Sequence, residues 1–112
     1  MKLPNADKAI ITPEKLRDYL LNENHPKGRS KARFFRGLGF HRQTWRLLDE
    51  AFRSQHLQMD AEEIQGNAFG RKFQIVAHLS GPTDATAIIK SVWIVLNGED
   101  VPRLVSAFPE RA

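Results

Sequence analysis

The 112-residue sequence contains no cysteine. Without thiols the chain cannot form disulfides, offer a thiolate nucleophile, or bind zinc or an iron–sulfur cluster through cysteine. Long apolar runs are also missing, since the longest, at residues 92–96, is far shorter than the roughly 20 residues that span a bilayer. No signal-peptide core follows the basic N-terminal residues. We therefore expect a cytoplasmic protein without membrane contacts, folded as one domain over residues 1–112.

Acidic residues are missing from one long segment. Residues 24–48 carry seven Lys or Arg and two His but no Asp or Glu. The other ten Lys and Arg are outnumbered by the thirteen acidic residues, so the formal net charge of +4 conceals a basic segment on an acidic remainder. A concentrated positive field attracts polyanions. RNA or another polyanion is therefore the predicted partner, and an acidic protein, as in a toxin–antitoxin pair, is the alternative.

The first half of the sequence predicts helices. A threonine–proline–glutamate sequence at residues 12–14 supplies an N-cap hydroxyl, a proline at the first helical position and a carboxylate in the first turn. Residues 22–29 have the composition of a loop. We expect Ser30 to cap a second helix and a third helix to occupy about residues 42–55, with His56 exposed at its end.

The second half predicts strands. Residues 72–79 alternate between polar and apolar, as in a half-buried strand. Residues 85–96 are apolar on both alternating sets, which predicts a central strand covered at least in part on both sides. Residues 101–108 predict a strand in which Pro102 belongs at the strand start or at an edge of the sheet, and the segment around Ile64 predicts one further strand. The predicted fold is α+β: N-terminal helices pack on one face of an antiparallel β-meander of three to four strands.

The types of reaction that the sequence does not exclude are metal-free reactions at phosphate. The sequence has no metal-ligand spacing, no phosphate-cradling glycine loop and no nucleophile elbow, so we predict no metal and no cofactor. Cleaving RNA through its own 2′-hydroxyl needs a base, an acid and cations. His25 precedes the predicted helix start at Ser30, where free N–H groups attract anions, and Lys27, Arg29 and Lys31 surround it. The alternative for His25 is a solvated basic loop.

A second basic set lies on the predicted strands. Lys72, Lys90 and Arg103 would form a cationic row beside Ser106 if they share one face of the sheet. The alternative is three unrelated surface charges. Lys90 stands out because a charge within so apolar a strand needs a partner or an exposed face.

Several sequence blocks resemble a family of small bacterial domains of unknown function. The blocks include LPNADKA at residues 3–9, HPKGRSKARFF at 25–35 and GEDVPRLVSAFP at 98–109, of which the last two are fairly specific. Members are stand-alone proteins or C-terminal domains of larger bacterial proteins, some similar to polymorphic toxins. The layout is similar to that of the barnase, EndoU, colicin and RelE group of metal-independent RNase toxins, which is a fold-level analogy.

The resemblance implies RNA cleavage or RNA binding, with a non-catalytic protein-interaction domain using the basic surface of residues 24–48 as the alternative. Many members carry Thr where this chain has Ser106 and Tyr where it has Phe108. The predicted catalytic residues are His25 as acid or base, and Lys31 and Lys72 as stabilisers of the phosphorane. The predicted substrate-binding residues are Lys27, Arg29, Lys90, Arg103 and Ser106.

Overall fold

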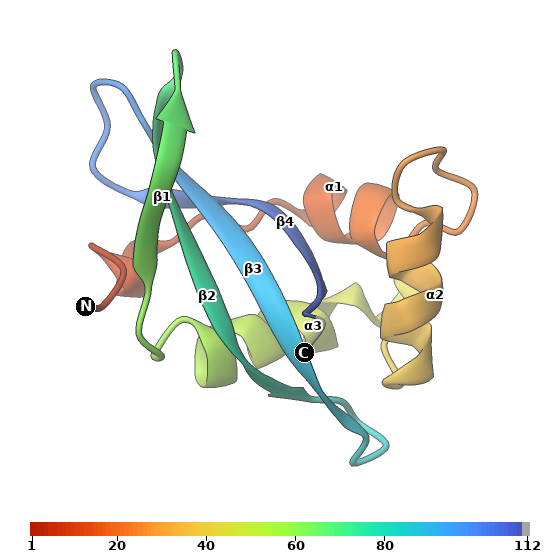
Figure 1. Cartoon of the computed structure of the whole chain (residues 1–112). Coiled ribbons are helices and arrows are strands. Elements are labelled where there is room, and N and C mark those ends of the chain that lie inside the picture. The colour runs from red at the N-terminus through yellow and green to blue at the C-terminus, as the bar shows by residue number, and fades with distance from the viewer. Residues whose placement is uncertain (111–112) are drawn as a thin grey trace.

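The computed structural model describes residues 1–110, in which helical segments precede a four-stranded sheet (Figure 1). The helical segments are η1 (Ala6–Lys8), α1 (Pro13–Lys15), η2 (Leu16–Leu20), α2 (Arg29–Gly37), η3 (Arg42–Thr44), α3 (Trp45–Ala51) and η4 (Phe52–His56). The strands are β1 (Glu62–Asn67), β2 (Gly70–Ser80), β3 (Thr86–Leu96) and β4 (Pro102–Pro109). The predicted α+β fold is confirmed.

The sheet is an antiparallel meander in the order β1-β2-β3-β4. β2 and β3 pair over their whole lengths, from Gly70 opposite Leu96 to Ser80 opposite Thr86. β4 pairs with the other side of β3 and forms an edge of the sheet, as predicted. A bulge interrupts the β3–β4 register beside Trp93. Bulges re-aim side chains near functional sites, and this one precedes Ser106.

The helices pack on one face of the sheet and beside β4. Figure 1 shows α3 behind the sheet, whereas α1 and α2 lie next to β4. In the core, the Phe52 ring meets both Trp93 and Phe35 edge-to-face, each with centroids 6.5 Å apart, the geometry that aromatic pairs prefer. Phe52, Trp93 and Phe35 are each 0% exposed.

The opposite face of the sheet carries no helix from residues 1–110, and we call it the open face. The prediction that the strand at residues 85–96 is covered at least in part on both sides agrees with β3, whose open-face residues are half-buried from residue 90 onward, although Ile88 is 43% exposed. In β2, Val76 is 45% exposed on the same face. Every helical segment precedes the sheet in the chain, and the segments from α1 to η4 pack against one another and against β2 or β4. The open-face apolar residues gain cover only from their cross-strand neighbours.

The first helix begins as predicted and the second does not. Thr12 Oγ1 accepts a hydrogen bond of 3.2 Å from the Lys15 N–H, the contact expected of an N-cap. α2 starts at Arg29, one residue before the predicted cap, so Ser30 lies inside the helix. Gly28 holds the N-cap position because the chain passes so close to Tyr19 there that any side chain would overlap the Tyr19 carbonyl oxygen.

His56 is fully buried, which corrects the prediction of a surface residue. Its Nε2–H donates to the Ala77 carbonyl (3.2 Å), and its Nδ1 lies 2.8 Å from Ser91 Oγ. Ser91 Oγ in turn accepts a 2.8 Å hydrogen bond from the Trp93 indole N–H. Burial lowers the pKa of His56, since the charged imidazolium would lose its hydration. The neutral ring therefore serves as a polar link between η4 and the sheet.

Candidate functional site

The loop before α2 is built around the His25 side chain. His25 Nδ1 accepts hydrogen bonds from the backbone N–H groups of Lys27 (3.0 Å) and Gly28 (3.1 Å). A neutral imidazole has one acceptor nitrogen, so this arrangement places the hydrogen on Nε2. The Nε2–H is thus the free hydrogen-bond donor of the His25 ring within residues 1–110.

Tyr19, from η2, lies against this loop and against β4. Its ring meets the His25 ring edge-to-face at 5.0 Å between centroids. Its hydroxyl is 3.3 Å from Ser106 Oγ, a contact between residues 87 positions apart in the chain. The ammonium groups of Lys15 and Lys31 lie 5.3 and 5.5 Å from the centre of the Tyr19 ring. Five polar or charged side chains thus converge within a few ångströms.

These neighbours alter the acidity of the Tyr19 hydroxyl. Burial alone would raise the pKa of Tyr19, because it penalises the phenolate. The hydrogen bond with Ser106 and the nearby ammonium groups of Lys31 and Lys15 outweigh burial and lower the pKa of Tyr19. The Tyr19 hydroxyl therefore ionises more readily than that of an ordinary tyrosine, and it lies beside cations that have no carboxylate partner within residues 1–110.

The converging side chains line a cleft of about 500 Å³, which we call the Tyr19 cleft. Its lining combines α1, η2, the His25 loop and β4, namely Thr12, Glu14, Lys15, Tyr19, His25, Lys27, Val105 and Ser106. Among residues 1–110, neither Lys15, Lys27 nor the adjacent Lys31 has a carboxylate within 4.0 Å. Their charges remain available to an anion, opposed in the lining by Glu14.

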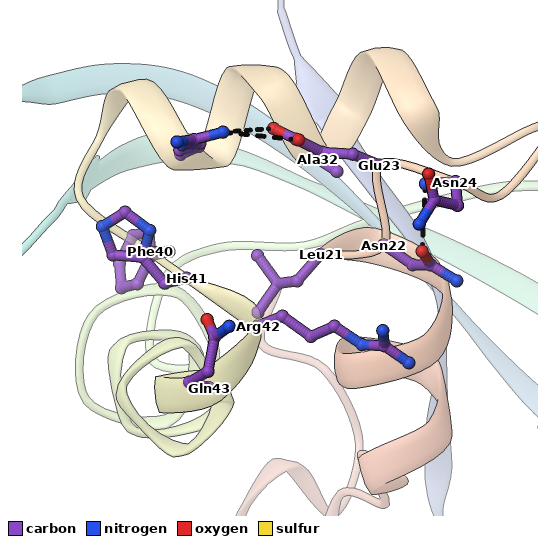
Figure 2. Close-up of a pocket in the computed structure, with 10 residues that line it drawn as sticks. Leu21, Asn22, Glu23, Asn24, Ala32, Phe40, His41, Arg42 and Gln43 are labelled. Atoms are coloured by element: carbon purple, nitrogen blue, oxygen red, sulfur yellow. Dashed lines mark hydrogen bonds and ion pairs between the residues drawn. The ribbon is translucent and has the colours of Figure 1, made fainter.

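A second cleft of about 260 Å³, which we call the Asn24 cleft, lies between the loop, α2 and η3 (Figure 2). Here the cations are paired, since Arg36 contacts Glu23 and Arg42 contacts Asp18, each at 3.1 Å. Hydrogen bonds from Arg17 and Arg42 lower the pKa of Asp18 to about 2. The Asn24 cleft is consequently polar but nearly neutral, and it is a weaker candidate for an anion.

The structure brings together part of the predicted site. His25, Lys27 and Ser106 line the Tyr19 cleft, and Lys31 lies beside the Tyr19 ring. Arg29 is exposed at the first position of α2 and does not line the cleft. The four clustered residues come from the loop, the helix that follows it and the edge strand.

The strand cations share the open face with Ser106, which stands opposite Val92, but none of the three lines the Tyr19 cleft. Lys72 and Arg103 both stand opposite Ile94, on either side of β3, whereas Lys90 stands opposite Phe108. Arg103 pairs with Glu99 (3.1 Å), and Lys90 pairs with Glu110 (3.3 Å). Lys72 has no carboxylate partner among residues 1–110. Two of the three predicted cations are therefore neutralised by partners in their own chain.

Sequence reasoning missed Tyr19 and Lys15. Tyr19 lies at helical spacing from the apolar residues Leu16 and Leu20, which accounts for its half-buried ring. Two signals were present: Tyr19 is the only tyrosine of the chain, and Lys15 precedes it by one helical turn. The contact between Tyr19 and Ser106 could not be predicted from neighbouring residues, because the two are 87 positions apart and meet only when η2 packs beside β4.

Within residues 1–110, no group of three or more His, Cys, Asp or Glu side chains is arranged to hold a metal ion. No helix of the same residues is long and apolar enough to cross a membrane.

The fold and cleft define a small α+β domain with a basic, tyrosine-containing cleft at its sheet edge. A similar fold occurs in a chain of a contact-dependent growth inhibition toxin–immunity protein complex from Klebsiella pneumoniae 342, with a TM-score of 0.60 and 13% sequence identity over 96% of this chain and 97% of that chain. The chain belongs to the family described as Domain of unknown function (DUF6883), whose model matches residues 2–111. No curated protein matches the sequence.

Proposed function

We propose that this domain binds RNA through a phosphodiester in the Tyr19 cleft and cleaves it there without a metal ion. The observation that carries the proposal is the gathering of Lys15, Lys27 and Lys31, free of carboxylate partners within residues 1–110, around Tyr19 and His25. Cations, hydrogen-bond donors and a proton acceptor are the groups that this reaction requires. An RNA substrate agrees with the cytoplasmic location expected from the sequence.

The proposed reaction is an attack by the RNA on its own backbone. The Tyr19 phenolate takes the proton of the 2′-hydroxyl, whose oxygen then forms a bond to phosphorus. The bond between phosphorus and the 5′ oxygen breaks, and a lysine ammonium of the cleft protonates the leaving oxygen. The products are a 2′,3′-cyclic phosphate and a 5′-hydroxyl.

The other cleft residues hold the phosphate. The His25 Nε2–H donates a hydrogen bond to one of its non-bridging oxygens, while the Ser106 hydroxyl donates to the Tyr19 phenolate. The ammonium groups of Lys31 and Lys27 stabilise the charge that develops on the phosphorane, where fixed cations are most effective because they need no rearrangement. Lys31 has a second role, since its charge favours ionisation of Tyr19.

A toxin-like role is supported by one observation, the likeness of this fold to a chain of a toxin–immunity protein complex. The similar chain from Klebsiella pneumoniae belongs to a toxin–immunity protein complex, and RNA cleavage is one activity that such a domain could deliver. At 13% identity this likeness does not carry residue roles.

The test is cleavage of a labelled RNA by the purified protein in the presence of EDTA, with the product ends analysed for cyclic phosphate. Tyr19→Phe removes one hydroxyl and should lower the rate about 100-fold or more, the usual contribution of a general base. His25→Asn keeps an acceptor near Nδ1 and removes the Nε2–H. It should weaken activity without unfolding the protein. Lys8→Ala, an exposed lysine outside the cleft, is the control.

Cleavage that persists in Tyr19→Phe would refute the role of the cleft. Loss of cleavage in EDTA would refute the metal-free reaction. RNA binding without cleavage by the wild-type protein would reduce the proposal to an RNA-binding domain.

A second candidate function uses the same cations to bind an acidic protein. The favouring observation is that Lys27, Arg29, Lys31 and Arg33 have no carboxylate partner within residues 1–110. An acidic partner seated there would block the Tyr19 cleft. A co-expressed acidic protein that binds the wild type, is released by salt and competes with RNA would support this function.

A further inference from the structure

The Asn24 cleft and the Tyr19 cleft share the loop between η2 and α2 as a common wall. Asn24 lines one cleft, and the next residue, His25, lines the other. Consecutive Cα atoms are about 3.8 Å apart, so the two clefts approach each other at this point of the loop. A ligand that occupies both clefts would therefore have to pass over this loop, a path about as short as one nucleotide step.

The free polar groups of the Asn24 cleft are amides and an imidazole. The side chains of Asn24, His41 and Gln43 make no hydrogen bond within residues 1–110, and all three are exposed. Figure 2 shows Gln43 rising from η3 toward Leu21, with Asn24 on the opposite side. Buried apolar residues, among them Leu21, contribute to the same wall.

This lining suits a nucleobase better than a phosphate. An amide side chain presents a donor and an acceptor side by side, which matches the edge of a base. The arginines of the cleft are already paired with Glu23 and Asp18, so little free positive charge remains for an anion. The volume of about 260 Å³ is near the lower limit of small-molecule pockets, about 300 Å³, and fits one ring system.

Resting on the proposed function, we propose that the Asn24 cleft binds the nucleobase of the nucleotide adjacent to the phosphate in the Tyr19 cleft, and that Asn24 and Gln43 select that base. The Tyr19 cleft then supplies affinity and chemistry without regard to sequence, as phosphate contacts do, and the Asn24 cleft supplies base preference.

The experiment measures binding of four homopolymeric oligonucleotides (A, C, G and U) whose 2′-hydroxyls are methylated, so that they cannot be cleaved. Fluorescence anisotropy gives the affinity of each for the wild type, for the double variant Asn24→Ala/Gln43→Ala, and for Gln65→Ala. Gln65 is an exposed amide on β1 outside both clefts and serves as the matched control.

The wild type and the control should rank the four bases in one order, with about a tenfold difference between the best and the worst, the discrimination expected of one good amide–base contact. The double variant should bind all four within about twofold of one another and keep the salt dependence of the wild type. An unchanged ranking in the double variant, or no ranking in the wild type, would overturn the inference alone. A wild type that binds none of the oligonucleotides would overturn the proposed function as well.

Discussion

Replacing Ser91 with alanine should destabilise the protein far more than the loss of one hydroxyl suggests. Ser91 Oγ accepts a hydrogen bond from the Trp93 indole N–H and lies 2.8 Å from His56 Nδ1. All three residues are 0% exposed, so water does not replace the lost contacts in the native packing. The variant would therefore leave a buried donor and a buried acceptor unsatisfied.

The magnitude follows from these two orphaned groups. A buried polar group without a partner costs about 1–3 kcal/mol, so the pair should cost about 2–6 kcal/mol. The free energy of unfolding of a domain is about 5–15 kcal/mol. Ser91→Ala should thus remove a large part of the stability while leaving the cleft residues intact.

The assay is urea unfolding followed by far-ultraviolet circular dichroism at pH 7.5. Ser80→Ala is the matched control: the Ser80 hydroxyl hydrogen-bonds Thr86 at 2.8 Å on the exposed side of the β2–β3 hairpin. Its loss should cost less than about 1 kcal/mol, because water can replace the contact. A Ser91→Ala cost no greater than the Ser80→Ala cost would refute the reasoning.

Burial lowers the pKa of His56, so just below its ordinary value of about 6.5 only the unfolded chain takes up this proton. In urea unfolding from pH 8 to 5, stability should be complete above about pH 6.5 and fall below it by at most about 1.4 kcal/mol per pH unit. Gly28→Ala should cost about 1–3 kcal/mol in thermal unfolding through overlap with the η2 backbone, whereas Gly37→Ala, with open space around it, should be neutral or stabilising. In RNA binding over a salt series, Lys31→Ala should reduce the slope by about 1, and the ion-paired Arg103 should contribute nothing.

The elements of the fold were predictable because each has a local signature. Helical spacing and the cap at Thr12 fixed the first helix, and the alternation along residues 72–79 fixed β2. The burial of His56 was not predictable in this way. Its position at a helix end suggests exposure, and its partners Ser91 and Ala77 are 35 and 21 residues away.

The candidate site was predictable only where its residues are close in sequence. His25, Lys27 and Lys31 belong to one basic segment, so their proximity follows from the chain itself. The pairing of the strand cations was not predicted. Lys90 contacts Glu110, twenty residues later in the chain, whereas Arg103 contacts Glu99, only four residues earlier in the turn before β4.

Tyr19 contacts the His25 loop, the start of α2 and the edge strand β4 through its backbone, its ring and its hydroxyl. Its carbonyl oxygen leaves no room for a side chain at Gly28, its ring packs against His25, and its hydroxyl meets Ser106. Different substitutions at this one position therefore distinguish a role in RNA cleavage from a role in holding the loop in place. Phenylalanine removes only the hydroxyl and should spare the loop, while alanine also removes the ring that supports His25. If both substitutions abolish cleavage but only alanine alters stability, the hydroxyl has a chemical role beyond holding the cleft together.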